Sequence, residues 1–262
     1  MRQRVAVFAF LVTLPLFLSF PLSGQTPTSN RALPRTPEGK PDLSGIWQVM
    51  NTADWNILPH EAHKGFPAGL GIVNADSLPY QPWAVAKQKE NFAVRESLDT
   101  DGKCFLPGVP RIMYEPYPFQ ITQTPQTVIM LFEYVNAMRN VYLDTPHPPG
   151  KIDWWMGDSR GKWEGDTLVV DVIDFNGDTW FDRIGDFHSN DLHVIERFTM
   201  TDPDHIQYLA TIEDPKVYTK PWQMNMVLYR HTEPNFQILE YECYTFEDES
   251  RGNLAPPKGP GK

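Results

Sequence analysis

The second half of the chain is a succession of short segments rich in β-branched and aromatic residues. Nine such segments lie between Phe119 and Tyr244: FQITQ, TVIMLFEY, MRNVYLD, GKWE, TLVVDVI, LHVIERFTMT, HIQYLATIED, WQMNMVLYR and FQILEYECY. Turn residues separate them, and Gly165-Asp166 within WEGDTLVV predicts a tight hairpin. Short strands that recur every 8–12 residues or so are typical of antiparallel barrels and sandwiches. We therefore expect a mainly β fold, an antiparallel β-barrel of roughly eight to ten strands.

One segment ahead of these strands is typical of a helix. In LPYQPWAVAKQKENFAV, Pro82 suits the first helical position, and Trp83, Lys87 and Glu90 follow at helical spacing. Loop-like tracts without a sustained period flank this segment. We expect an N-terminal helix and long loops that cover one end of the barrel.

The composition changes along the chain in a way that predicts four regions. The basic start, the apolar run and the small residues near Gly24 indicate a signal peptide at 1–24. Residues 25–41, rich in Pro, Thr and Ser, indicate a flexible leader, and 251–262 indicate a disordered tail. Residues 42–250 are expected to form a single β-barrel domain.

Charge and cysteine content narrow the class of protein. The formal net charge is −10, or about −12 once Arg2 and Arg4 leave with the signal peptide. Nucleic acids and anionic membranes bind proteins through clustered Lys and Arg, and this sequence has no such cluster, so neither is an expected partner. After cleavage of the signal peptide, the mature chain is expected to leave the membrane. The two cysteines, Cys104 and Cys243, predict a disulfide in an oxidising compartment, either periplasmic or extracellular. Two buried free thiols are the alternative.

Several longer motifs resemble those of a large, mostly uncharacterised group of exported bacterial proteins. They include PDLSGIW, CFLPGVPR, GKWEGDTLVVD, HSNDLHVIERF and EDPKVYTKPW, and the resemblance covers nearly the whole mature chain. The resemblance implies export but no particular reaction. The Gly-x-Trp of SGIW is also similar to the first strand of lipocalins, which implies a lipocalin- or calycin-like barrel.

The segment DFHSNDLHVIERF concentrates titratable side chains at the start of a strand. If TDPDH forms the next turn, His193 lies opposite Asp214 on one face of a hairpin, and Glu196 lies on the other face. A carboxylate beside an imidazole orients the ring for acid–base chemistry. We predict His193 as a general base, Asp214 as the carboxylate that orients it and Glu196 as an acid, although both groups could equally form structural pairs.

Other side chains are candidates for binding a ligand. Arg139 and Arg197 could pair with Glu196, while Tyr134 and Trp155 belong to an aromatic set that could line a pocket or fill the core. His188 at the mouth of the strand is a further candidate. A metal near His188 and His193 is disfavoured, because their spacing matches no established metal-site pattern.

The function that these residues predict is the processing of a small molecule or saccharide. We expect an acid–base lyase, hydrolase or isomerase that works in a barrel cavity without a cofactor, since phosphate loops, dinucleotide fingerprints and nucleophile elbows are missing from the sequence. A lipocalin-like carrier without turnover is the first alternative, and a structural or partner-binding envelope protein is the second. The oligomeric state is left open.

Overall fold

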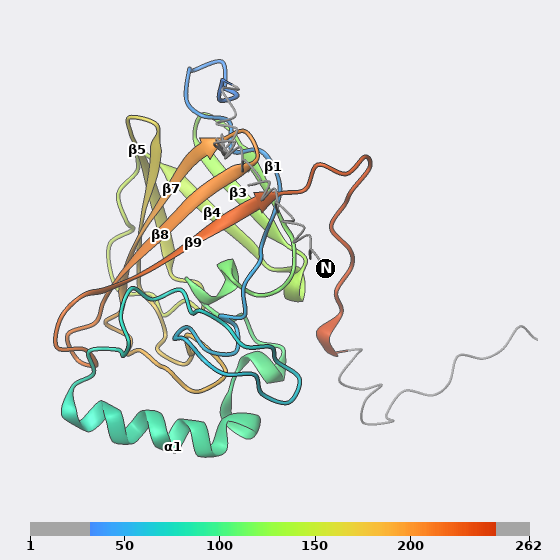
Figure 1. Cartoon of the computed structure of the whole chain (residues 1–262). Helices are drawn as coiled ribbons and strands as arrows, with labels where there is room; N and C mark the ends of the chain where they lie inside the picture. Colours follow the sequence, from blue (N-terminus) through green and yellow to red (C-terminus); the bar gives the residue numbers. More distant parts are fainter. Residues whose placement is uncertain (1–31, 245–262) are drawn as a thin grey trace, which may run out of the picture. The chain divides into compact units, whose positions relative to one another are not determined.

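The computed structural model describes residues 32–244, so the predicted signal peptide and C-terminal tail lie outside the described residues. Nine strands form a closed barrel in which each strand pairs with its neighbours in sequence order, and β1 pairs with β9 (Figure 1). The strands are β1 (Gly45–Val49), β2 (Phe119–Gln123), β3 (Thr127–Phe132), β4 (Met138–Leu143), β5 (Asp158–Glu164), β6 (Thr167–Ile173), β7 (His193–Asp202), β8 (His205–Glu213) and β9 (Trp222–Arg230). The mainly β barrel predicted from the strand pattern is confirmed.

One helix and several long loops accompany the barrel. The helix α1 (Pro82–Leu98) starts at the predicted proline and lies across one end of the barrel (Figure 1). It approaches the loop that precedes β7 closely: a Cβ on Gly185 would lie 2.6 Å from the Cβ of Asn91, and the positive φ of Gly185 also favours glycine. Three short 3-10 helices are also present: η1 (Asp101–Lys103), η2 (Arg111–Met113) and η3 (Tyr134–Asn136).

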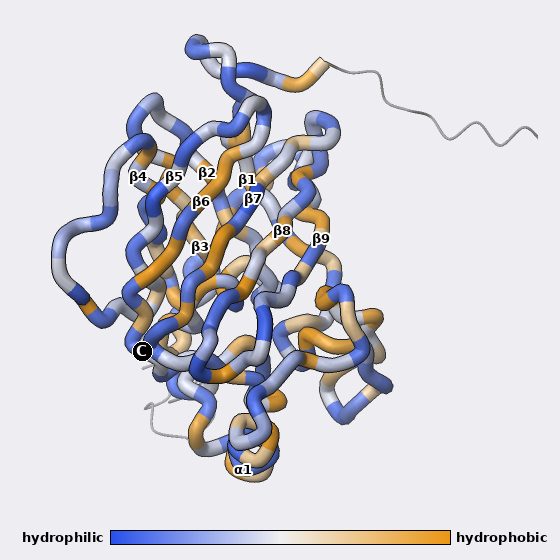
Figure 2. The backbone as a smooth tube through the Cα atoms, turned by 90° about the vertical axis from the view of Figure 1, so that its left-hand side faces the viewer, coloured by the Kyte–Doolittle hydropathy of each residue, from blue (hydrophilic) through white to orange (hydrophobic). Residues whose placement is uncertain are grey.

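Burial alternates along the strands, so that each strand turns one face into the core. Along β7, Val194, Glu196, Phe198 and Met200 are buried, while the residues between them are partly exposed. Figure 2 shows polar and apolar stretches following one another along the strands. Large side chains such as Trp47 lie in the core with almost no exposed surface. Side chains therefore fill the barrel, as in other small barrels.

The strand β4 and the strand β5 form the one parallel pair among the described strands. The other eight pairs are antiparallel. A parallel pair needs a crossover connection, and here residues 144–157 provide it without a helix. This segment, called the crossover below, runs outside the barrel. It returns the chain to the end of the barrel at which β4 begins, so that β5 can run parallel to β4.

The barrel is closed by β1 and not by the segment Phe236–Tyr244, which the sequence pattern predicts as a strand. That segment contains no strand, because β9 already pairs with β1 and offers no free edge. Its Tyr241 packs against aromatic rings near the end of the barrel.

The predicted disulfide is present between Cys104 and Cys243. It fastens the segment after β9 to the loop that follows α1. Within residues 32–244, no helix has the length and apolar character needed to cross a membrane.

Candidate functional site

The pairing of β7 with β8 differs by one residue from the predicted register. At the turn, Asp202 faces His205 as expected. A β-bulge between Met200 and Asp202 then shifts the pairing, so that Met200 faces Ile206 and His193 faces Glu213. The prediction that His193 lies opposite Asp214 is wrong, because a bulge adds a residue to one strand and displaces every later pair.

His193 lies on the outer face of the barrel between two carboxylates. Its Nε2 is 2.8 Å from Asp171 Oδ1 on β6, and its Nδ1 is 3.3 Å from Glu213 Oε2 on β8. The hydrogen bond to Asp171 raises the pKa of His193, and it outweighs the opposing effect of burial. This arrangement is a cross-strand charge cluster on the surface.

Asp214 is buried at the end of β8, where it holds a loop in place. Its carboxylate accepts hydrogen bonds from the Ser189 amide at 2.5 Å, from the Ser189 hydroxyl at 3.0 Å and from the Lys216 amide at 3.1 Å. The predicted catalytic group of His193, Asp214 and Glu196 is therefore distributed over three separate environments.

Glu196 lies inside the barrel and forms an ion pair with Arg139 of β4. Arg139 Nη1 donates to Glu196 Oε1 at 3.0 Å, Nη2 donates to Oε2, and the Tyr208 hydroxyl donates to Oε1 at 2.9 Å. Arg139 Nε also donates to Ser159 Oγ at 3.0 Å. The predicted Arg139 partner is confirmed, whereas Arg197 points outward and contacts Glu164.

His188 and Tyr134 are both buried in polar contacts that satisfy them. His188 Nε2 lies 2.7 Å from Thr179 Oγ1 and its Nδ1 lies 2.8 Å from Ser189 O. Burial lowers the pKa of His188 and favours the neutral ring. Tyr134 donates to Asp101, and burial raises its pKa. Within the described residues, no group of three or more His, Cys, Asp or Glu side chains is arranged to hold a metal.

One pocket lies outside the barrel, between the β4–β5 pair and the crossover. Its volume is about 520 Å³, which is enough for a small organic molecule. The walls are mainly aromatic and apolar, and they include Trp154, Trp155, Tyr142 and Met138. We call this pocket the β4–β5 groove. Two of the predicted binding residues, Arg139 and Trp155, line it.

Exposed rings make the groove a surface for stacking. Trp154 is 47% exposed and Tyr142 is 42% exposed, both high values for aromatic side chains beside a pocket. Trp155 stacks on Phe105 at 4.9 Å between ring centroids, which fixes the orientation of its ring. The guanidinium of Arg160 lies 4.8 Å from the Tyr142 ring centroid and stabilises that ring by a cation–π contact.

A histidine–carboxylate pair that the sequence pattern does not predict lies at the edge of the groove. His147 Nδ1 is 2.6 Å from Asp158 Oδ2, and Asp158 also accepts two hydrogen bonds from Arg160, at 2.6 and 2.7 Å. Burial raises the pKa of Asp158, but the bonds from Arg160 and His147 outweigh it, so the pKa is lowered and the carboxylate stays ionised. His147 Nε2 lies 3.7 Å from Asp171 Oδ1.

Linear spacing gives no signal for this pair. His147 lies in a proline-rich stretch of the crossover and Asp158 is the first residue of β5. Only the return of the chain along a parallel strand brings them together.

Comparison of the sequence with protein-family models, and with curated proteins, gave no match in either case.

Proposed function

We propose that the protein is exported and binds an uncharged small molecule, a saccharide or a planar organic compound, in the β4–β5 groove. The observation that carries this proposal is the exposure of Trp154 and Tyr142 beside a pocket of about 520 Å³. Aromatic rings contribute large contact areas and interact favourably with the faces of other rings and apolar groups. The disulfide supports export, because such bonds persist in oxidising compartments.

The charges in the groove favour a neutral ligand. Arg160 forms two hydrogen bonds with Asp158 and a third with Thr145 Oγ1 at 3.0 Å. Arg139 is bound by Glu196 and Ser159. An anionic ligand would have to compete with these carboxylates, and leaving a buried charge without its partner is costly. Hydroxyl-bearing or planar neutral molecules need no such exchange.

Binding can be tested by titrating the mature protein with neutral mono- and disaccharides and with neutral aromatic alcohols, using calorimetry. Trp154→Ala should weaken binding of the best ligand about tenfold, since loss of one stacking ring costs on the order of 1–3 kcal/mol by analogy with base stacking. Trp83→Ala is the matched control, because Trp83 is 54% exposed on α1 and does not line the groove. Equal loss in both variants, or failure of every ligand to bind, would refute the proposal.

Acid–base turnover is a second candidate, and the His147–Asp158 hydrogen bond favours it. Asp158 holds Nδ1 of His147, so Nε2 is the ring nitrogen left to accept a proton. Among the described residues, Nε2 has no hydrogen-bond partner, and it is covered by surrounding atoms. The crossover would therefore have to move during turnover. If the protein is an enzyme, His147→Gln should abolish conversion of the bound ligand while binding persists. If it is a carrier, neither the wild-type protein nor His147→Gln should convert the ligand.

A further inference from the structure

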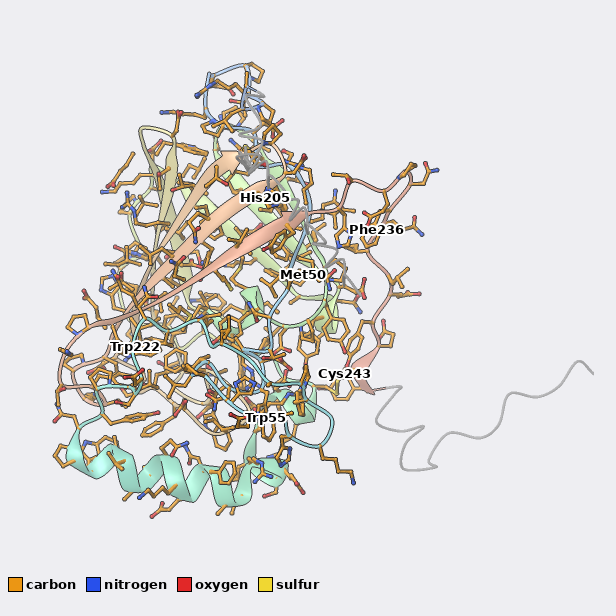
Figure 3. All side chains as sticks on the ribbon, in the orientation of Figure 1. Met50, Trp55, His205, Trp222, Phe236 and Cys243 are labelled. Carbon is orange, nitrogen blue, oxygen red and sulfur yellow. A yellow bond between two sulfur atoms is a disulfide. The ribbon has the colours of Figure 1, made fainter. Side chains whose placement is uncertain are left out.

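A second pocket lies at the end of the barrel that α1 covers. Trp55 marks its position in Figure 3. The pocket has a volume of about 370 Å³ and lies between a short hairpin, the C-terminal part of α1 and the loop between β6 and β7. In the hairpin, His60 pairs with Gly69 and His63 pairs with Phe66. None of its lining residues lines the β4–β5 groove.

The pocket gathers basic side chains in an otherwise acidic protein. Lys64, Arg95 and Arg183 line it, although acidic residues outnumber Lys and Arg by 33 to 23 over the chain. Two acidic residues also line it. Asp99 is already bound by both Nη atoms of Arg111, at 2.9 and 3.0 Å. The other, Glu96, lies with its Oε1 3.8 Å from Arg95 Nη2 in an exposed ion pair, and its side chain is 91% exposed. The positive charge at the pocket is therefore only partly neutralised.

Arg183 lines the pocket, and the carboxylates of Asp101 and Asp54 contact part of its guanidinium. Its Nη2 lies 2.8 Å from Asp101 Oδ2, and its Nε lies 3.8 Å from Asp54 Oδ2. Among the described residues, neither Nη1 nor Nε of Arg183 has a hydrogen-bond partner. Burial raises the pKa of Asp54 and of Glu115, two carboxyls close to this arginine.

The walls of the pocket are aromatic and fixed by stacking. Trp55 stacks with His63 at 4.7 Å and with Phe66 at 4.6 Å between ring centroids. Arg183 lies 5.8 Å from the Phe66 ring, and Arg95 lies 5.9 Å from the Trp55 ring. Cations anchored beside aromatic faces can meet the charged end of a ligand while the rings meet its apolar body.

We propose that this pocket binds a small organic anion, a carboxylate with an aromatic or apolar body. Its size, at the lower end of ligand pockets, fits a single-ring compound. Lys64 and Arg95 attract and orient the carboxylate, and Nη1 of Arg183 donates to it. The pocket shares no lining residue with the β4–β5 groove, and this proposal does not depend on the function of that groove.

Benzoate and its neutral isostere benzamide are the probes that test the charge requirement. Binding to the mature, disulfide-bonded protein is measured by ligand-observed NMR and calorimetry at low ionic strength. Benzoate should bind saturably at millimolar concentration, several-fold tighter than benzamide, and added salt should weaken it because exposed charges are screened. Equal affinity for benzamide, or no saturable binding of benzoate, would overturn the proposal.

Variants locate the binding to this pocket. Lys64→Gln and Arg95→Gln should each weaken benzoate binding up to about fivefold, the range expected of partly exposed ion pairs. Lys89→Gln is the matched control, since Lys89 is an exposed cation on the same helix as Arg95 but does not line the pocket. Arg183→Gln is less suitable, because it would also remove one of the two arginines that pair with the buried Asp101. An unchanged affinity in both pocket variants, or an equal loss in Lys89→Gln, contradicts the assignment.

Discussion

A leucine in place of Glu196 would leave the guanidinium of Arg139 charged and buried inside the barrel. Arg139 is 3% exposed and Glu196 is fully buried, so water cannot replace the lost carboxylate. Ser159 would still accept one hydrogen bond from Arg139, while the Tyr208 hydroxyl would lose its acceptor.

The size of the effect follows from these contacts. Removing one partner of a buried ion pair costs about 3–5 kcal/mol, and the unsatisfied Tyr208 hydroxyl adds about 1 kcal/mol. Glu196→Leu should therefore lower the free energy of unfolding by about 4–6 kcal/mol. For a domain of this size the melting temperature should fall by about 8–24 °C.

The assay is equilibrium urea unfolding of the oxidised mature protein at pH 7, followed by tryptophan fluorescence. The double variant Arg139→Met with Glu196→Leu should regain most of the stability, because an apolar pair of similar volume replaces both charges. Glu164→Gln, which removes the exposed contact with Arg197, is the control and should shift the midpoint little. If Glu196→Leu is as stable as this control, or if the double variant is no more stable than the single one, the reasoning fails.

Two further perturbations test other contacts. The hydrogen bond to Asp171 raises the pKa of His193, so its contribution is fully present below the unfolded-state pKa of about 6.5 and is lost as pH rises through the higher folded-state pKa. His193→Gln should therefore destabilise the protein more at pH 5.5 or so than at about pH 9. Urea unfolding midpoints of the variant and the wild-type protein at the two pH values measure this difference, and an equal loss of stability at both would contradict the prediction. The Cys104–Cys243 bond closes a loop of 139 residues, for which the chain-entropy model gives up to about 5 kcal/mol of stabilisation. Reduction and alkylation should lower the urea midpoint accordingly, and an unchanged midpoint would show that the loop is already restrained in the unfolded chain.

The strands were predictable because their side chains repeat with a period of two over one buried face. The hairpin at Gly165-Asp166 forms where the sequence predicts it, with Glu164 paired to Thr167. The same pattern in Phe236–Tyr244 does not produce a strand. Propensity alone cannot tell whether a sheet edge is free, and β1 already occupies that edge.

The site was less predictable, because it depends on two features that leave no local signal. Thr201 is the extra residue of the bulge that shifts the β7–β8 register. Because of this shift, His193 faces Glu213 and not the predicted Asp214. The buried Glu196–Arg139 pair survives the shift, because the face of a residue within its own strand does not depend on its partner strand. The apposition of His147 and Asp158 depends on a parallel strand direction, which hydrophobic alternation does not encode.

The parallel β4–β5 seam also bears on the order in which the barrel assembles. On one side of it, β5 to β9 form an antiparallel series joined in sequence order, and β2 to β4 do the same on the other side. Contacts close in sequence form early, because closing a short loop loses little entropy. We expect two preformed sheets to meet at the seam, with β1 and β9, far apart in the chain, completing the ring last. Mutations at the seam should then slow folding, whereas those in the β1–β9 contact should mainly speed unfolding.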